Sequence, residues 1–257
     1  MTDQGDPASV PGSTPWFRRW FGEEYLRLYP HRDRDEARDG VELLLSRRPE
    51  VARGPVLDLA CGAGRHLDVL STRGVPCVGL DLSLSLLSRA HQTRPHLRLV
   101  RGDMRRLPFN PSSFSAVTSF FTSFGYFDSE EGDRRVAREV HRVLRPGGTF
   151  FLDFLNAHSV LDQLIPRDEH VVEGRRVIQE RRVLPGGRIV EKRIRIETEP
   201  PDDPDRTFVE RVRLYTADEL STLLAAVGLE TSERFGDYKG GAPSPASPRA
   251  IIVARAR

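Results

Sequence analysis

The chain has 257 residues, of which 38% are hydrophobic and 30% are charged, so it is neither collagen-like, a coiled coil nor wholly disordered. Its 39 basic and 37 acidic side chains leave a net charge of +2 and are spread along the whole length, which gives no footprint for a nucleic-acid partner. Its two cysteines exclude a disulfide framework and a four-thiolate zinc site. No apolar run approaches the ~20 residues of a membrane helix and no secretory leader opens the chain, so we expect a soluble, cytoplasmic protein without a membrane partner.

The beginning of the chain predicts a tail and a helical cap. Residues 1–15 are small, polar and rich in Pro and Gly, which is typical of a disordered tail. Aromatic residues then recur near helical spacing from Trp16 to Tyr29, which predicts one amphipathic helix that ends at Pro30. A second helix is predicted over 35–46, so that 16–50 form an N-terminal helical cap.

Residues 51–156 alternate between short apolar runs and longer amphipathic ones. The apolar runs predict strands over 56–60, 76–81, 97–101, 114–121 and 149–154. The amphipathic runs predict helices over 64–73, 84–90 and 128–144. This alternation is typical of a parallel sheet covered on both faces, so the fold class is α/β, doubly wound and Rossmann-like.

The pattern changes to period two between residues 171 and 214. Residues 177–198 predict a β-hairpin around Pro185-Gly186-Gly187, and a Pro- and Asp-rich turn over 200–206 leads to another strand. We therefore expect an antiparallel β insert over 157–213, after the fifth strand of the sheet.

Residues 214–257 return to the pattern of the core. A helix is predicted over 216–229, with a capping box formed by Thr216 and Glu219. Strands over 230–235 and 250–256 then complete a seven-stranded mixed sheet.

A glycine-containing turn follows the first predicted strand, in the sequence VLDLACGAGRHL (56–67). Gly62 and Gly64 allow the backbone to approach a ligand, and the start of the next helix offers free N–H groups. Leu67 stands where a dinucleotide fingerprint needs its third glycine, and no GK[ST] follows to make a P-loop. The turn therefore disfavours a nicotinamide-dependent oxidoreductase and an NTPase.

Two carboxylates follow the next two strands. Asp81 ends the second strand, where it can accept hydrogen bonds from both hydroxyls of a ribose. Asp103 follows the third strand and is available to an exocyclic amine, beside Met104, which can lie against an aromatic base. Because the carboxyl ends of parallel strands meet at one edge of the sheet, we expect these loops to converge there.

Together, the segments 58–66, 79–83, 102–109 and 143–154 resemble the motifs of class I S-adenosylmethionine-dependent methyltransferases. The resemblance implies S-adenosylmethionine as the cofactor. It also leaves open that Asp58 is purely a structural anchor of the glycine loop. The resemblance implies that Asp58 orders the glycine loop, which includes Gly64, and that Ala60 and Gly62 face the methionine part of the cofactor. It also implies that Asp81 binds the ribose and that Leu82, Asp103 and Met104 lie around the adenine.

Residues 114–128 resemble the fourth motif of small-molecule methyltransferases, including glycine and sugar N-methyltransferases. The resemblance implies a backbone contact from Phe120 to the cofactor, and it places Thr122 and Tyr126 near the transferred methyl group. The segment is neither the [DN]-P-P-[YF] motif used on nucleobase amines nor the P-C motif of cytosine C5 enzymes. A small-molecule acceptor is therefore favoured over nucleic acid.

Residues 20–33 resemble the segment that closes the cofactor pocket in this group of methyltransferases. The resemblance makes Tyr25, Tyr29 and Arg32 candidate cofactor-binding residues, and makes His31, with Tyr126, a candidate general base. Packing of Tyr25 and Tyr29 on the sheet is the alternative. Arg32 could pair with a carboxylate of the cofactor or the substrate.

Other polar residues lie where this architecture binds substrates. Asn156 leaves the fifth strand at its carboxyl end and Tyr238 lies in the loop 236–249, so both are candidate substrate contacts. Asp153 and His158 invite a metal-binding interpretation, but the paired acidic ligand is missing, so no metal is expected. His66, at the start of a helix, is expected to cap or pack.

The predicted reaction is in-line transfer of a methyl group to a nitrogen, oxygen or carbon of a small acceptor, in which the protein mainly aligns the reactants. The β insert either covers the acceptor side or forms a homodimer surface, since exposed strand edges pair readily. A catalytically degenerate S-adenosylmethionine-binding regulator or scaffold is the alternative function.

Overall fold

A computed structural model describes residues 14–29, 34–197 and 206–257 of the chain. The predicted tail over 1–15 therefore lies outside the described residues, apart from Thr14 and Pro15. His31 and Arg32, the two candidates in the segment between the cap helices, lie outside them too.

The main sheet is mixed and has seven strands, as the sequence predicts, and their order is β10-β11-β5-β4-β1-β2-β3. Strands β1 to β5 pair in parallel, and β11 is antiparallel to both of its neighbours, β5 and β10. The strands are β1 (Val56–Leu59), β2 (Cys77–Asp81), β3 (Leu99–Arg101), β4 (Phe114–Ser119), β5 (Leu144–Leu155), β10 (Leu229–Phe235) and β11 (Arg249–Ala256).

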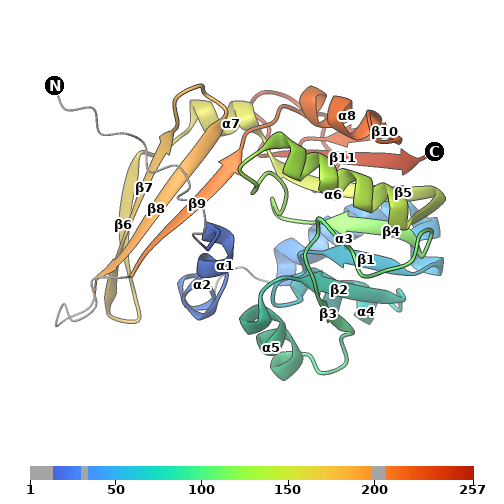
Figure 1. Cartoon of the computed structure of the whole chain (residues 1–257), viewed down its shortest axis with the longest axis horizontal. Coiled ribbons are helices and arrows are strands. Elements are labelled where there is room, and N and C mark those ends of the chain that lie inside the picture. Colours follow the sequence, from blue (N-terminus) through green and yellow to red (C-terminus); the bar gives the residue numbers. More distant parts are fainter. Residues whose placement is uncertain (1–13, 30–33, 198–205) are drawn as a thin grey trace.

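Helices cover both faces of this sheet (Figure 1). Successive side chains of a strand point to opposite faces, so Phe150 and Phe151 belong to two separate apolar clusters. The first cluster includes side chains of α6 and α8, and the second includes side chains of α3 and α4. The helices around the main sheet include α3 (Arg34–Arg47), η1 (Pro49–Arg53), α4 (Arg65–Thr72), α5 (Leu84–Thr93), α6 (Glu130–Val143) and α8 (Ala217–Ala225).

The N-terminal cap differs from its prediction. The single helix expected from Trp16 to Tyr29 is two short helices, α1 (Trp16–Trp20) and α2 (Glu23–Leu28). The break falls at Phe21 and Gly22, and Gly22 is extended, with φ −145° and ψ −152°. Glycine is a poor helix residue, which accounts for a break at this position.

The insert folds as a second, four-stranded antiparallel sheet in the order β6-β7-β8-β9. It is preceded by a short helix, α7 (Ala157–Asp162), which the sequence pattern did not predict, and the first strand was also missed. Its strands are β6 (Arg167–Val172), β7 (Arg175–Val183), β8 (Ile189–Glu197) and β9 (Thr207–Arg213). The predicted hairpin around Pro185-Gly186-Gly187 is present between β7 and β8. Figure 1 shows α1 and α2 between this sheet and the main one.

The cap is joined to the insert by apolar and polar contacts. Trp20 and Leu28 are buried against Val177 and Ile194 of the insert. The ring nitrogen of Trp20 donates to Glu210, and Lys192 Nζ donates to the hydroxyl of Tyr29 at 2.9 Å. The insert therefore fixes the position of the cap over the core.

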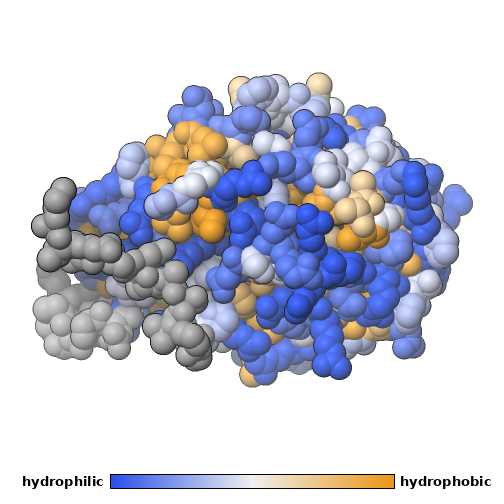
Figure 2. All heavy atoms as spheres, turned by 45° about the horizontal axis from the view of Figure 1, so that its top comes forward, coloured by the Kyte–Doolittle hydropathy of each residue, from blue (hydrophilic) through white to orange (hydrophobic). Residues whose placement is uncertain are grey.

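Figure 2 shows a face that is hydrophilic over most of its area, with scattered apolar patches. Leu161, in α7, and Ile165, just after it, are among the large apolar side chains that are exposed. Across the described part of the chain, the structure contains no helix with the length and apolarity needed to span a membrane.

Candidate active site

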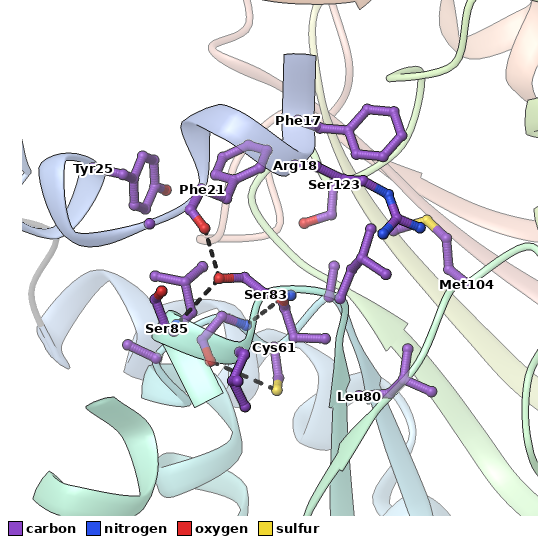
Figure 3. A pocket seen from close by; sticks show the side chains of 18 of the residues that line it. Phe17, Arg18, Phe21, Tyr25, Cys61, Leu80, Ser83, Ser85, Met104 and Ser123 are labelled. Carbon is purple, nitrogen blue, oxygen red and sulfur yellow. Dashed lines mark hydrogen bonds between the residues drawn. The ribbon is translucent and has the colours of Figure 1, made fainter. Parts of the chain in front are cut away.

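A cavity of about 680 Å³ lies where the loops after β1, β2, β3 and β4 meet the N-terminal cap. This volume is typical of a small-molecule or cofactor site. The carboxyl edge of the parallel strands forms its floor, and α1 and α2 form its roof (Figures 1 and 3). The sequence-predicted residues that line it are Tyr25, Tyr29, Ala60, Gly62, Asp81, Leu82, Asp103, Met104, Phe120 and Tyr126.

The glycine loop after β1 uses its glycines in two ways. Gly62 has a φ of 56° and lines the cavity, where an added Cβ would meet only Leu86 at 3.8 Å. Gly64, with a φ of 82°, is the N-cap of α4, and a Cβ there would lie 2.8 Å from Leu97 Cδ1. Gly62 is thus open to a ligand, whereas Gly64, which does not line the cavity, allows the close turn into α4.

Asp58 lies behind this loop and does not line the cavity. Its side chain is buried and accepts a hydrogen bond from Thr118 Oγ1 at 3.0 Å, which joins β1 to β4. Burial raises the pKa of the Asp58 carboxyl to about 7, and its Oδ2 has no hydrogen-bond partner among the described residues. Its placement agrees with the structural-anchor alternative.

Asp81 joins the first two loops of the site. Its Oδ2 accepts from the backbone N–H of Gly62 and its Oδ1 from that of Ser83, both at 2.8 Å. Burial raises the pKa of this carboxyl, while these backbone hydrogen bonds oppose the rise. A carboxylate has about four acceptor positions, so two hydrogen bonds leave capacity for the two hydroxyls of a ribose.

Ser83 connects the loop after β2 to the cap. Its hydroxyl donates to the carbonyl of Phe21 at 2.6 Å and accepts from the N–H of Leu86 at 3.2 Å, as the N-cap of α5 (Figure 3). The roof of the cavity is therefore bonded directly to the loop that carries Asp81.

This link predicts a measurable effect of Ser83→Ala. We expect the variant to bind S-adenosylmethionine about threefold to tenfold more weakly, because a net hydrogen bond contributes ~0.5–1.5 kcal/mol. Calorimetric titration measures the change. Ser88→Ala, an exposed position of the same helix, is the matched control. Equal affinity of Ser83→Ala and wild type would contradict a role of the link in closing the cavity.

At the end of the cavity formed by the loop after β3, Asp103 is held by Arg105. The carboxylate accepts from Arg105 Nε at 3.1 Å, Nη2 at 2.7 Å and the backbone N–H at 2.9 Å. The hydrogen bond from the Arg105 side chain is the main reason that the pKa of Asp103 is lowered. Figure 3 shows Arg18 from α1 directed toward Met104 at this end. Neither Arg105 nor Arg18 could be assigned from the sequence motifs.

The segment after β4 forms an aromatic wall. Phe120, Phe121, Ser123 and Tyr126 all line the cavity. The ring of Tyr126 stacks on Phe21 of the cap, with centroids 5.6 Å apart. Phe21 was not among the predicted site residues, because its place in the broken helix could not be read from helical spacing.

His66 packs beside this wall. Its ring is buried and lies parallel to that of Phe120, with centroids 4.2 Å apart. Burial lowers its pKa well below the usual value, so the imidazole is neutral at pH 7. The buried ring, stacked on Phe120, agrees with the expectation that His66 is a packing residue.

Three predicted substrate residues lie outside the cavity lining. Thr122 Oγ1 accepts from Arg249 at 3.3 Å, and the hydroxyl of Tyr238 donates to Asp153 at 2.5 Å. Asn156 accepts from the N–H of His158 as the N-cap of α7. Its Nδ2 donates to the carbonyls of Ser244, Pro245 and Ser247. The polar atoms of these three side chains are thus hydrogen-bonded within the fold, outside the cavity lining.

Tyr25 and Tyr29 contribute both to the cavity lining and to the packing of the cap. Each lines the cavity, and each also packs its ring edge-on against Trp20. Burial is the main cause of a raised pKa for Tyr29, so its hydroxyl stays protonated at neutral pH. The described residues contain no cluster of His, Cys, Asp and Glu suited to a metal ion.

Comparisons with known proteins agree with this geometry. The methyltransferase domain family matches residues 56–148. A dTDP-3-amino-3,4,6-trideoxy-alpha-D-glucopyranose N,N-dimethyltransferase of Streptomyces venezuelae is 29% identical over 226 residues, which cover 86% of this chain and 92% of the relative. The similarity thus reaches beyond the core into the cap and the insert.

Solved structures show the same arrangement. CalS10 of Micromonospora echinaspora, described as a SAM-bound amino pentose methyltransferase, is 27% identical with a TM-score of 0.67, over 91% of this chain and 97% of that one. The CcbJ methyltransferase of Streptomyces caelestis has a TM-score of 0.78 over 92% and 98% of the two chains, and at 20% identity it supports the fold alone. The matched family, the relative and the solved structures together support a class I S-adenosylmethionine-dependent methyltransferase.

Proposed function

We propose that this methyltransferase acts on the amino group of a small sugar-like acceptor, and that Asp81, Leu82, Asp103 and Met104 hold the adenosine of its cofactor. The observation that carries the proposal is one continuous cavity that runs from these residues to the aromatic wall at Tyr126. The nitrogen acceptor is supported by two relatives that match 86% of this chain and are named N,N-dimethyltransferases of amino sugars.

The residues present fit the cofactor. Asp81 keeps two acceptor positions, which suits a ribose diol. The site beside Gly62 has room that a side chain would fill, and Leu82 and Met104 offer apolar surface to a base. Asp103 receives three hydrogen bonds from Arg105, so it has one acceptor position left for an exocyclic amine.

Bound S-adenosylmethionine supplies a methyl group on a positively charged sulfur. The leaving group is the neutral thioether of S-adenosylhomocysteine, so the cofactor provides it. The protein therefore needs no nucleophile, and its part is to align the acceptor and to exclude water. The cap supplies the exclusion through Phe21 and Tyr25, whose rings lie 5.0 Å apart in the roof. Aromatic faces also favour a cation nearby, and both the sulfonium and a methylated ammonium are cations.

We assign the orientation of the amine to Tyr126. Its ring is held between Phe21 at 5.6 Å and Trp16 at 5.1 Å, which limits its rotation. A neutral amine attacks through its lone pair, so a hydroxyl that accepts a hydrogen bond from one amine N–H turns that lone pair toward the methyl group. His31, the other predicted base, lies outside the described residues.

The insert has two proposed roles. Its contact with the cap supports the first, which is to cover the acceptor side. Strand β6 is at the edge of the insert sheet and carries the exposed Val171, so a second copy of the chain could pair there as a homodimer.

Two matched sugars, one with an amine and one with a hydroxyl at the same position, test the proposed function. We expect a nucleotide-linked amino sugar to gain one and then two methyl groups by mass spectrometry, with release of S-adenosylhomocysteine. The same sugar with a hydroxyl in place of the amine should gain none, because a neutral hydroxyl is a much weaker nucleophile. The rate should rise with pH as the amine loses its proton. Equal methylation of both sugars, or of the hydroxyl form alone, would contradict the nitrogen acceptor.

A further inference from the structure

Two consecutive residues in the aromatic wall have left-handed backbone conformations. The φ angles are 58° at Phe121 and 61° at Thr122. Side chains other than glycine rarely adopt such angles, and a β-branched threonine is especially unfavourable there. Strained backbone persists only where the surroundings hold it, and it concentrates at functional sites.

A single buried carboxylate holds this turn. Asp153 lies in β5, and its Oδ2 accepts from the backbone N–H of Phe121 at 2.7 Å and from the hydroxyl of Tyr238 at 2.5 Å. Its Oδ1 accepts from Arg249 Nε at 2.7 Å. The main-chain carbonyl of Asp153 also accepts from the N–H of Thr122 at 3.0 Å.

Asp153, Tyr238 and Arg249 together form a clamp on the turn, and Arg249 also contacts the side chains of the turn. Its Nη2 donates to Thr122 Oγ1 at 3.3 Å, and its guanidinium lies 5.3 Å from the centre of the Phe121 ring. Arg65 lies 4.5 Å from the same ring and is paired with Glu36 at 2.7 Å. Phe121 thus contacts two cations, and both its backbone and its ring are fixed.

The clamp and the cavity are adjacent but separate. Asp153, Thr122, Tyr238 and Arg249 do not line the cavity, whereas the neighbouring Phe120, Phe121 and Ser123 do. Asp153 therefore does not line the cavity itself, and its hydrogen bonds to the backbone reach the cavity wall through the turn.

We propose that Asp153 is a positioning residue for methyl transfer: by holding Phe121 and Thr122 in their left-handed turn, with Arg249 and Tyr238, it sets the wall against which the acceptor is aligned. The proposal rests on the proposed function, because it assigns the wall to the acceptor. It gives Thr122 and Tyr238 a role in place of the substrate contact that their sequence positions suggested.

Asp153→Asn is the first test, because it keeps the shape and one acceptor oxygen. With that oxygen toward Arg249, the amide NH₂ faces the N–H of Phe121, which loses its acceptor. We expect kcat to fall by ~10- to 100-fold, as for other small misplacements of reacting groups. The Kd for S-adenosylmethionine should change little, because Asp81 and Asp103 are unaffected. A loss of cofactor affinity equal to the loss of kcat would contradict the proposal.

Rescue separates positioning from general damage. Asparagine tolerates a positive φ far better than threonine does. Thr122→Asn added to Asp153→Asn should therefore restore part of kcat, while Thr122→Val, which stays β-branched, should not. Rescue by both substitutions, or by neither, would overturn the proposal. Tyr238→Phe removes one hydrogen bond without leaving an unpaired charge, so it should give a smaller loss of kcat in the same direction.

A fluorine NMR measurement made without the methyl acceptor separates the positioning role of Asp153 from the proposed amine acceptor. In fluorotyrosine-labelled protein, with its five tyrosines, Asp153→Asn should shift the fluorine signal of Tyr126 and leave that of Tyr29 in place. Thr122→Asn should return the Tyr126 signal. An unmoved Tyr126 signal would overturn the positioning role. If wild type methylates no amine, the proposed function fails while this spectrum still decides the role of Asp153.

Discussion

Replacing Asp81 with alanine is expected to weaken the binding of S-adenosylmethionine by ~1.5–3 kcal/mol, as for the loss of hydrogen bonds to a charged group. This corresponds to an increase in Kd of about 10- to 150-fold. The substitution removes the acceptor for the ribose hydroxyls. It also releases the N–H groups of Gly62 and Ser83, which Asp81 holds at 2.8 Å.

Calorimetric titration with S-adenosylmethionine and S-adenosylhomocysteine measures this change, and thermal unfolding of the unliganded variant shows whether the loop alone has moved. Asp81→Asn, which keeps one acceptor oxygen, should fall between wild type and Asp81→Ala. Asp218→Ala removes an exposed carboxylate of α8 that is paired with Arg234, and it serves as the control. An affinity unchanged by Asp81→Ala would contradict the assignment of the ribose to this residue.

The pH dependence of stability is the second large effect. Burial raises the pKa of Asp58 to about 7, whereas an aspartate in an unfolded chain has a pKa of ~3.9. Between these values the folded state binds more protons than the unfolded state, so the free energy of unfolding falls as pH rises. Asp58 therefore lowers the free energy of unfolding by ~4 kcal/mol at most. This loss develops as pH rises from the unfolded pKa to about 7, and it stays constant at higher pH.

Asp58→Asn removes this ionisation and keeps an oxygen for Thr118. We expect the stability of the variant relative to wild type to increase by up to ~4 kcal/mol between pH 4 and pH 8, in urea unfolding of the unliganded protein. Asp133, whose pKa is also raised, to about 6, contributes to both proteins and cancels in the difference. A stability difference that stays the same across this range would show that Asp58 does not ionise within it.

The sequence predicts the main sheet well, because its signal is local. Each buried parallel strand is a short apolar run, and each crossover helix is an amphipathic one, so the pattern of residues 51–156 leaves little ambiguity. The insert is predicted only in part. β6 contains Arg167, Asp168, Glu169 and His170, and it becomes a strand because it pairs with β7. Such pairing is a long-range property that a polar run does not reveal.

The residues of the candidate site were likewise predicted only in part. Asp81 and Asp103 were predicted because their loops must meet at the edge of the sheet, and both line the cavity. Phe21 and Arg105 were missed, since their roles depend on the break between α1 and α2 and on a side-chain direction. Asn156 was expected in the site because it follows β5, but its amide is used to hold the loop 244–247. Position at the end of a strand predicts nearness to a site, while the direction of the side chain depends on tertiary contacts.

A crystal structure with bound S-adenosylhomocysteine tests the central claim most directly. We expect the ribose hydroxyls on Asp81, the adenine beside Leu82 and Met104, and the sulfur directed toward the wall that holds Tyr126. Binding of S-adenosylhomocysteine outside this cavity, or inside it with the ribose away from Asp81, would contradict the account.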